Sequence, residues 1–356
     1  MFLFSQARQF IQDYQDEKRL FVLKEHRILL WFTLLVAFLF VPFVGSEYLF
    51  NAILVPFLIL ALAGLGLNIL TGYAGQLSLG SAAFMAVGAF ATYNLELRIP
   101  QLPLLLNLVL GGVIAGIFGI LVGLPSLRIK GFYLIVSTLA AQFFVPWLFT
   151  QYSWFTHENS SGVITAPPLQ IAGVSLNSPV GHYLLTLSVV VLLTLLARNV
   201  LNSQYGRAFR AVRDMETAAT TIGISVGKTK LIAFALSSFY LGVAGSLWAF
   251  AYLGTIEADG LDLSRSFQIL FIIIIGGLGS LTGSFLGAAF IVLLPIALSI
   301  LGTLLFGHSL DQALLQNLQK IIFGGLIIYF LIKEPEGLIR LFSMAYQRIR
   351  KWPLRY

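Results

Sequence analysis

Residues 223–229 read GISVGKT, which ends like a nucleotide-binding P-loop. A P-loop needs four residues between its two glycines, so that successive backbone N–H groups can surround the phosphates. Here only three residues separate Gly223 from Gly227. The motif should also follow a buried strand, whereas the preceding RAFRAVRDMETAATTI has a charged pattern typical of a helix. The stretch is therefore not expected to bind ATP.

Other groups that could do chemistry are scarce. The chain has no cysteine, so neither disulfides nor thiolate metal sites can form. There is no HExxH motif, no His–carboxylate cluster and no carboxylate pair within an apolar segment. These absences argue against a membrane enzyme, and neither a cofactor nor a metal site is expected. The four histidines lie in the N-terminal tail or in outer segments: His26, His157, His182 and His308.

Neutral polar side chains occur inside the apolar segments, which are almost bare of charge. Carriers driven by protons or sodium usually keep ionisable groups there. A stand-alone secondary carrier is therefore the weaker alternative, and a partner would have to supply any energy. The neutral polar residues are Asn68, Gln76, Ser78, Ser137, Gln142, Ser237, Ser238 and Gln268, of which the first five are candidates for lining a translocation path.

The composition is that of an all-α, polytopic membrane protein. Of the 356 residues, 58% are hydrophobic and only 10% are charged, against about 25% charged in soluble domains. Neither 48–95 nor 266–310 contains a charged residue, and each run can hold two passes of about 20 residues. We expect about ten transmembrane helices, near residues 28–46, 49–70, 77–94, 103–124, 131–150, 181–198, 231–253, 267–283, 285–306 and 317–332.

The basic residues predict the orientation of these spans. With ten spans and a cytoplasmic N-terminus, only Arg98, Arg265 and Lys320 fall outside or near the outer face, and the other 19 of the 22 Lys and Arg residues are cytoplasmic. This distribution follows the positive-inside rule and places both termini in the cytoplasm. The expected parts are a cytoplasmic or interfacial tail (1–27), a transmembrane domain (28–332) with an outer loop (151–180) and a cytoplasmic loop (199–230), and a basic cytoplasmic tail (333–356). The start of the tail, MFLFSQARQF, has no apolar core of signal-peptide length, so no cleavage is expected.

Two glycine-containing stretches interrupt the apolar runs: LTGYAGQLSLG (70–80) and GGLGSLTGSFLG (276–287). Broken helices at membrane depth are tolerated where protein or a watery cavity satisfies the backbone, so these stretches indicate a translocation path. Glycines spaced four apart also occur in GGVIAGIFGILVG (111–123), where close helix packing is the favoured interpretation.

The segment GRAFRAVRDMETAATTIGISVGKTK (206–230) combines both charges in a short helical pattern. Arg207, Arg210 and Arg213 recur every three residues on one side, and acidic residues follow. The helix TAATTIG should stop at Gly223, a favourable C-terminal residue. The residues alone leave two interpretations open: a helix that docks on a partner protein, or an ordinary basic inner loop.

Four blocks in order resemble the permease subunits of branched-chain amino-acid ABC importers, of the LivM type, from about residue 49 to 337. They are LNILTGYAGQLSLGSAAFMAVGAF (67–90), LRIKGFYLIVSTLA (127–140), GRAFRAVRDMETAATTIGISVGKTKLIAFALSSFYLGVAGSL (206–247) and IIIIGGLGSLTGSFLGA (272–288).

The resemblance implies that 206–227 corresponds to the EAA loop, whose short helix sits in a cleft of the ATP-binding subunit. Ala218, Ala219 and Gly223 fit the EAA-x3-G pattern, but Thr217 stands where the glutamate is expected and Glu216 lies one position early. The expected coupling residues are Arg207, Arg210, Arg213, Asp214, Glu216, Ala218, Ala219 and Gly223.

The resemblance also implies partners, location and substrate. It implies ATP-binding subunits, a second related permease subunit, an extracytoplasmic binding protein and a bacterial cytoplasmic membrane with its lipids, and no nucleic acid. The outer loop 151–180 and the acidic segment 254–264 are candidate contacts for the binding protein. An uncharged interior suits neutral, branched-chain amino acids. It would equally suit urea or short amides, and the resemblance to this permease type implies these as the alternative substrates.

Overall fold

The computed structural model describes residues 32–127, 132–157, 163–167, 169–171, 174–175, 178–257, 259–306, 312–333, 337–341 and 344. The expected tail 1–27 and most of 333–356 lie outside these residues. The chain divides into two compact units, one of residues 1–47 with 342–356 and one of residues 48–341. In the first unit the described part is an apolar helix over Phe32–Val44, which includes a π-helical stretch and α3 (Val41–Val44).

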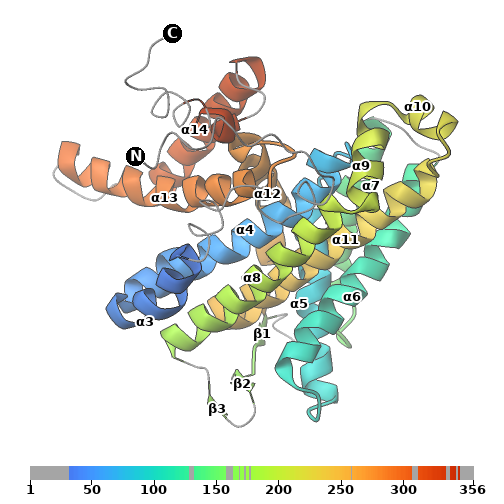
Figure 1. Cartoon of the computed structure of the whole chain (residues 1–356). Coiled ribbons are helices and arrows are strands. Elements are labelled where there is room, and N and C mark those ends of the chain that lie inside the picture. The colour runs from blue at the N-terminus through green and yellow to red at the C-terminus, as the bar shows by residue number, and fades with distance from the viewer. Residues whose placement is uncertain are drawn as a thin grey trace. The chain divides into compact units, whose positions relative to one another are not determined.

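The second unit is a helical bundle built around two long buried helices. One runs through Leu49–Tyr73 and contains α4, and the other runs through Val226–Leu253 and contains α11. α11 packs against α4, α5 and α6 (Figure 1). The helices are α4 (Val55–Asn68), α5 (Ser81–Arg98), α6 (Leu104–Gly123), α7 (Phe132–Gln151), α8 (Pro179–Asn202), α9 (Gln204–Asp214), α10 (Glu216–Thr221), α11 (Val226–Leu247), α12 (Leu263–Gly276), α13 (Leu281–Phe306) and α14 (Gln312–Lys333).

Small residues let these helices approach closely. A Cβ on Gly88 of α5 would lie 2.2 Å from the carbonyl oxygen of Gly242 on α11, so the two backbones touch there. The glycines of α6 meet α11 in the same way, since a Cβ on Gly119 would lie 2.1 Å from Oγ of Ser238. The packing interpretation of the four-residue glycine spacing is therefore confirmed.

Six helices in the described part of the chain are long and apolar enough to cross a membrane. This confirms an all-α polytopic membrane protein. One predicted boundary was wrong: the span expected at 267–283 is divided, because α12 ends at Gly276 and α13 begins at Leu281. Gly277 has a φ of 127°, a conformation that favours glycine and ends the helix. The six candidate spans are Leu49–Tyr73, Leu104–Gly123, Tyr133–Gln151, Pro179–Asn202, Val226–Leu253 and Leu281–Gly302.

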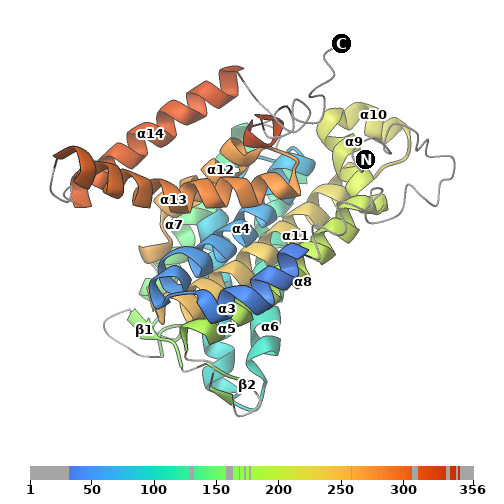
Figure 2. The same ribbon diagram turned by 60° about the vertical axis from the view of Figure 1, so that its left-hand side comes forward.

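Two short β-ribbons lie at the end of the bundle opposite α9 and α10 (Figure 1; Figure 2). β1 (Val163–Thr165) pairs antiparallel with β4 (Thr255–Glu257), and β2 (Gln170–Ile171) pairs with β3 (Val174–Ser175). Ile164 and Ile256 face each other in the first ribbon and are both buried. The ribbon thus joins segment 151–180, expected from the sequence to be the outer loop, to the acidic segment 254–264.

Candidate functional site

α9 and α10 form a compact projection between α8 and α11, here called the α9–α10 loop (204–223). Ser203 begins α9 by accepting a hydrogen bond from the N–H of Tyr205 at 3.2 Å. Phe209 and Val212 bury the inner face of α9. The three arginines Arg207, Arg210 and Arg213 share the exposed side, as the spacing predicted.

The end of α10 also follows the sequence. Gly223 has a φ of +86°, its N–H donates to the carbonyl of Thr220 at 3.1 Å, and the N–H of Ile224 donates to Ala219 at 3.0 Å. This pair of bonds is a Schellman motif, which needs a left-handed residue after the helix. The expected helix stop at Gly223 is therefore confirmed.

The outward face of α10 carries an apolar stripe that the charge pattern did not reveal. Met215 and Ile222 are 61% and 72% exposed, and Ala218 lies exposed between them at helical spacing. Ala219 instead is buried, with 2% of its surface exposed. The stripe Met215–Ala218–Ile222 is the face that a partner protein could cover.

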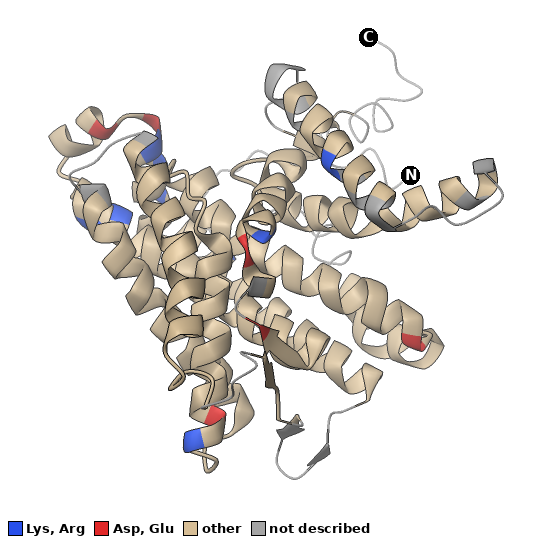
Figure 3. Ribbon diagram, turned by 180° about the vertical axis from the view of Figure 1, so that it is seen from behind, with Lys and Arg blue, Asp and Glu red and all other residues tan. Residues whose placement is uncertain are grey.

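Glu216, which lies one position before the glutamate expected in the EAA pattern, points back into the protein. Its Oε1 lies 2.6 Å from Nζ of Lys230, and the side chain of Lys230 is only 4% exposed. The pair holds the first turn of α10 against the base of α11. Asp214, by contrast, forms an exposed pair with Arg213 at 2.9 Å. Figure 3 shows acidic and basic residues together at this loop, while long stretches of the bundle helices carry no charge.

Arg213 connects this loop to both broken segments. Its Nη1 donates to the carbonyl oxygen of Gly72 at 2.9 Å. A Cβ on Gly75 would lie 2.8 Å from Cγ of Arg213, and one on Gly279 would lie 3.4 Å from Nη1 of Arg213. The guanidinium is therefore seated where segments 72–75 and 277–280 meet.

Asn68 joins the same two segments from within the bundle. Its Oδ1 accepts from the N–H of Gly279 at 2.8 Å, and its Nδ2 donates to the carbonyl of Ser280 at 2.8 Å and to Oγ of Ser284 at 3.0 Å. A Cβ on Gly72 would lie 2.4 Å from the backbone nitrogen of Gly279. The two interruptions are thus one packed junction.

Gln142, another candidate for the path, closes a buried network at the start of α5. Its Oε1 accepts from the N–H of Ala83 and from Oγ of Ser266, both at 2.8 Å, and its Nε2 donates to the carbonyl of Leu261 at 3.0 Å. Oγ of Ser266 also accepts from the N–H of Ala82 at 2.9 Å. The network supplies acceptors to the unpaired N–H groups of the α5 N-terminus.

The remaining candidates lie in or near the first break. Gln76 is buried, and its Nε2 donates to the carbonyl of Ala74 at 3.3 Å. Oγ of Ser78 accepts from the N–H of Gly80 at 3.3 Å. Ser137 is half-buried on α7, one residue before Thr138, whose Oγ1 accepts from the N–H of Leu79 at 3.0 Å. The structure gathers the candidates into two groups, at the junction of the two broken segments and around the α5 N-terminus.

Arg265, to which the sequence analysis assigned no functional role, lies in the first turn of α12. The Cζ of Arg265 is 4.3 Å from the centre of the Trp248 ring, and its Nη1 donates to Oε1 of Gln268. Its backbone N–H is capped by Oδ1 of Asp262 at 3.0 Å. The uncharged run begins at Ser266, directly after Arg265. For this reason the sequence pattern assigns Arg265 to a loop and not to the bundle.

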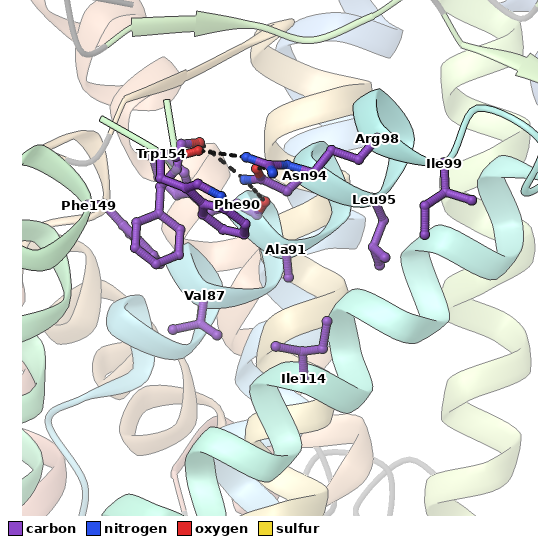
Figure 4. Close-up of a pocket in the computed structure, with 11 residues that line it drawn as sticks. Val87, Phe90, Ala91, Asn94, Leu95, Arg98, Ile99, Ile114, Phe149 and Trp154 are labelled. Carbon is purple, nitrogen blue, oxygen red and sulfur yellow. Dashed lines mark hydrogen bonds between the residues drawn. The ribbon is translucent and has the colours of Figure 1, made fainter. Parts of the chain in front are cut away.

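A cavity of about 320 Å³ lies between the C-terminal part of α5, the middle of α6 and the C-terminal end of α7 (Figure 4). Phe90, Ile114 and Phe149 line it, and Asn94 and Arg98 border it. The guanidinium of Arg98 is hydrogen-bonded within the protein at this cavity. Its Nε donates to Asn94 at 3.2 Å and its Nη2 donates to the carbonyl of Trp154 at 3.0 Å.

The described residues contain no group of His, Cys, Asp or Glu that could hold a metal ion. The α9–α10 loop is hydrogen-bonded to the junction of the two broken segments, within a bundle of apolar helices.

Comparisons with known proteins agree with this arrangement. A profile of the family described as "branched-chain amino acid transport system / permease component" matches residues 49–331. The chain belongs to this family, and it is a membrane-spanning permease subunit of the ABC-importer type.

Among its relatives is the high-affinity branched-chain amino acid transport system permease protein LivM of Salmonella typhimurium. The two are 29% identical over 312 residues, which cover 79% of this chain and 68% of the relative. LivM of Escherichia coli is 28% identical with the same coverage. A probable LivM of Methanocaldococcus jannaschii is 24% identical over 328 residues, or 82% of this chain and 93% of the relative. No solved structure matches the chain significantly.

Proposed function

We propose that this chain carries neutral, branched-chain amino acids through the cytoplasmic membrane of a bacterium, driven by ATP hydrolysis in separate ATP-binding subunits. The relatives named above are branched-chain amino acid permeases, which supports this substrate class. In the proposed arrangement residues 28–332 form the permease domain with ten spans, and the tails 1–27 and 333–356 are cytoplasmic. A second, related permease subunit completes the pore.

In this proposal the α9–α10 loop docks on an ATP-binding subunit. The apolar stripe Met215–Ala218–Ile222 enters a groove of that subunit, and the exposed arginines border it. The observation that carries the proposal is the bond from Arg213 to Gly72, because it connects the loop to the junction of broken helices. In this proposal the bundle alternates between a state open to the inside and a state open to the outside. An ATP-binding subunit that binds the loop more tightly in one of these states shifts the bundle toward that state.

The ribbon of β1 and β4 is the proposed contact of an extracytoplasmic binding protein. Its two strands come from the outer loop and from the acidic segment 254–264, and Thr165 and Thr255 pair at one end of it. The ribbon lies at the opposite end of the bundle from the α9–α10 loop (Figure 1), as a protein that receives substrate outside and energy inside requires.

Crosslinking tests the docking directly. The chain has no cysteine, so single cysteines at Met215 and Ile222 can be introduced cleanly into the complex in lipid. We expect both to crosslink to the ATP-binding subunit, and a control cysteine at Tyr152, which is exposed at the end of α7, to form no such crosslink. Failure of both crosslinks, with leucine uptake by the lone chain in vesicles, would support a secondary carrier instead.

A further inference from the structure

Trp248 and Arg265, whose side chains are in contact, each carry a buried N–H donor that has no acceptor among the described residues. Nε1 of Trp248 and Nε of Arg265 are both buried and have no hydrogen-bond partner among the described residues. Trp248 as a whole is only 4% exposed. The guanidinium lies over the indole ring, so the two side chains that carry these donors are in contact. A buried donor without an acceptor is costly, so such a pair indicates a ligand that supplies oxygen.

Arg98 gives a comparison within the same chain. Its Cζ also lies over a tryptophan, 3.8 Å from the centre of the Trp154 ring. There, however, Nε donates to Asn94 and Nη2 donates to a backbone carbonyl. Stacking on tryptophan therefore does not require an arginine to leave Nε unpaired, and the unpaired edge at Arg265 is a property of that site.

The first turn of α12 is held firmly around this contact. Gln268 accepts from Nη1 of Arg265, which fixes one side of the guanidinium. The next residue, Ser266, is bonded to Gln142 and to the N–H of Ala82. The free Nε side is thus presented by a rigid turn, and an arginine edge of this kind matches the two oxygens of a carboxylate.

The surrounding charges suit a zwitterion. Asp262 lies three residues before Arg265 and is exposed, with one oxygen bonded to the N–H of Arg265. It offers a negative charge to an ammonium group close to the guanidinium that would hold a carboxylate. Tyr252, whose ring centre is 4.6 Å from that of Trp248, adds an aromatic surface.

We propose that Arg265 and Trp248 bind the carboxylate of an α-amino acid during its passage through the bundle. The proposal rests on the proposed function, since it names the group of the transported molecule that this chain recognises. An uncharged interior would not distinguish an amino acid from its amide, whereas this site takes leucine and rejects leucinamide.

Two measurements on the complete transporter in lipid nanodiscs and liposomes test the site: equilibrium binding of labelled leucine and leucinamide, and ATP-dependent leucine uptake. Trp248→Phe keeps an aromatic ring and removes the N–H, and Arg265→Lys keeps the charge and removes Nε. We expect each variant to weaken leucine binding and uptake roughly tenfold, the effect of one hydrogen bond to a charged group. Arg98→Lys is the matched control and should leave leucine binding within about twofold of the unmodified complex.

The outcomes separate this site from the proposed function. Leucine binding that is unchanged in both variants, or equal binding of leucine and leucinamide by the unmodified complex, overturns the site whatever the uptake shows. Leucine binding that depends on Trp248 and Arg265, without ATP-dependent uptake, supports the site and contradicts the proposed function. Binding-protein-stimulated ATPase activity in each variant verifies that the complex has assembled.

Discussion

The guanidinium of Arg213 and the carbonyl of Gly72 are joined by a 2.9 Å hydrogen bond across 141 residues of sequence. Gly72 lies where the long helix Leu49–Tyr73 stops, and carbonyls at a helix end have no partner in the helix itself. The α9–α10 loop therefore satisfies the backbone of a broken transmembrane helix. Displacement of the loop must either carry this junction with it or break the bond.

Arg213→Gln should uncouple ATP hydrolysis from uptake. The change removes a hydrogen bond from a charged donor, worth about 1.5–3 kcal/mol, and with it the connection to Gly72. We expect leucine uptake by the reconstituted complex to fall at least roughly tenfold, while ATPase activity persists. Arg207→Gln is the control, because Arg207 is exposed and its hydrogen bond to the carbonyl of Asn202 is long, at 3.5 Å. Equal loss in both variants would show that overall charge, and not the bond, matters.

Gly72→Ala should destabilise the junction. Its new Cβ would lie 1.9 Å from Oδ1 of Asn68 and 2.4 Å from the backbone nitrogen of Gly279, so one of the segments must move. We expect a loss of about 1–3 kcal/mol, measured as a lower midpoint of thermal unfolding of the purified complex. Gly324→Ala is the matched control, since nothing lies within 4 Å of its added Cβ. A midpoint equal to that of the unmodified complex would contradict the tight junction.

The sequence predicts those features that depend on local pattern. Charge-free runs give the apolar spans, because lipid tolerates few charges. Gly223 marks the end of α10, because the residue that follows this helix takes a left-handed backbone conformation. The glycine interruption at 276–287 was recognised as well. The exact position of the interruption was not predicted. The reason is that the expected span 267–283 and the helix α12 that forms, Leu263–Gly276, are both apolar stretches.

Features that depend on tertiary packing escape the sequence. From the sequence, Lys230 is an ordinary basic residue at the membrane edge. Its contact with Glu216 can be seen only in the folded structure. Ala218 and Ala219 are chemically identical, yet the fold buries Ala219 and leaves Ala218 exposed. Arg265 looked like an outer-loop residue because it directly precedes the uncharged run.

Glu216→Ala should destabilise the α9–α10 loop, since it leaves the ammonium group of Lys230 buried and unpaired. Removing one partner of a buried pair costs about 3–5 kcal/mol, and the partial exposure of Glu216 reduces this to roughly 2–3 kcal/mol. We expect faster proteolysis within 204–223 in the purified complex. Replacing Lys230→Met in addition should restore most of the protection, because no buried charge then remains.

Asp214→Ala is the control for that pair, because the side chain of Asp214 is 65% exposed. Exposed ion pairs contribute about 0–1 kcal/mol, so the proteolysis rate should stay near that of the unmodified complex. A rate for Glu216→Ala that matches the Asp214→Ala rate would mean that the pair with Lys230 does not anchor α10.

Gln142→Leu should lower stability more than it alters transport, if Gln142 serves the α5 N-terminus. Leucine cannot accept from Ala83 and Ser266, and each buried donor left unpaired costs about 1–3 kcal/mol. We expect a thermal midpoint several degrees below that of the unmodified complex. Ser137→Ala, on the same helix and half-buried, should leave the midpoint unchanged. An unchanged midpoint for Gln142→Leu together with lost leucine uptake would instead make Gln142 a lining residue of the path, because a group that touches only the passing substrate contributes nothing to the stability of the empty bundle.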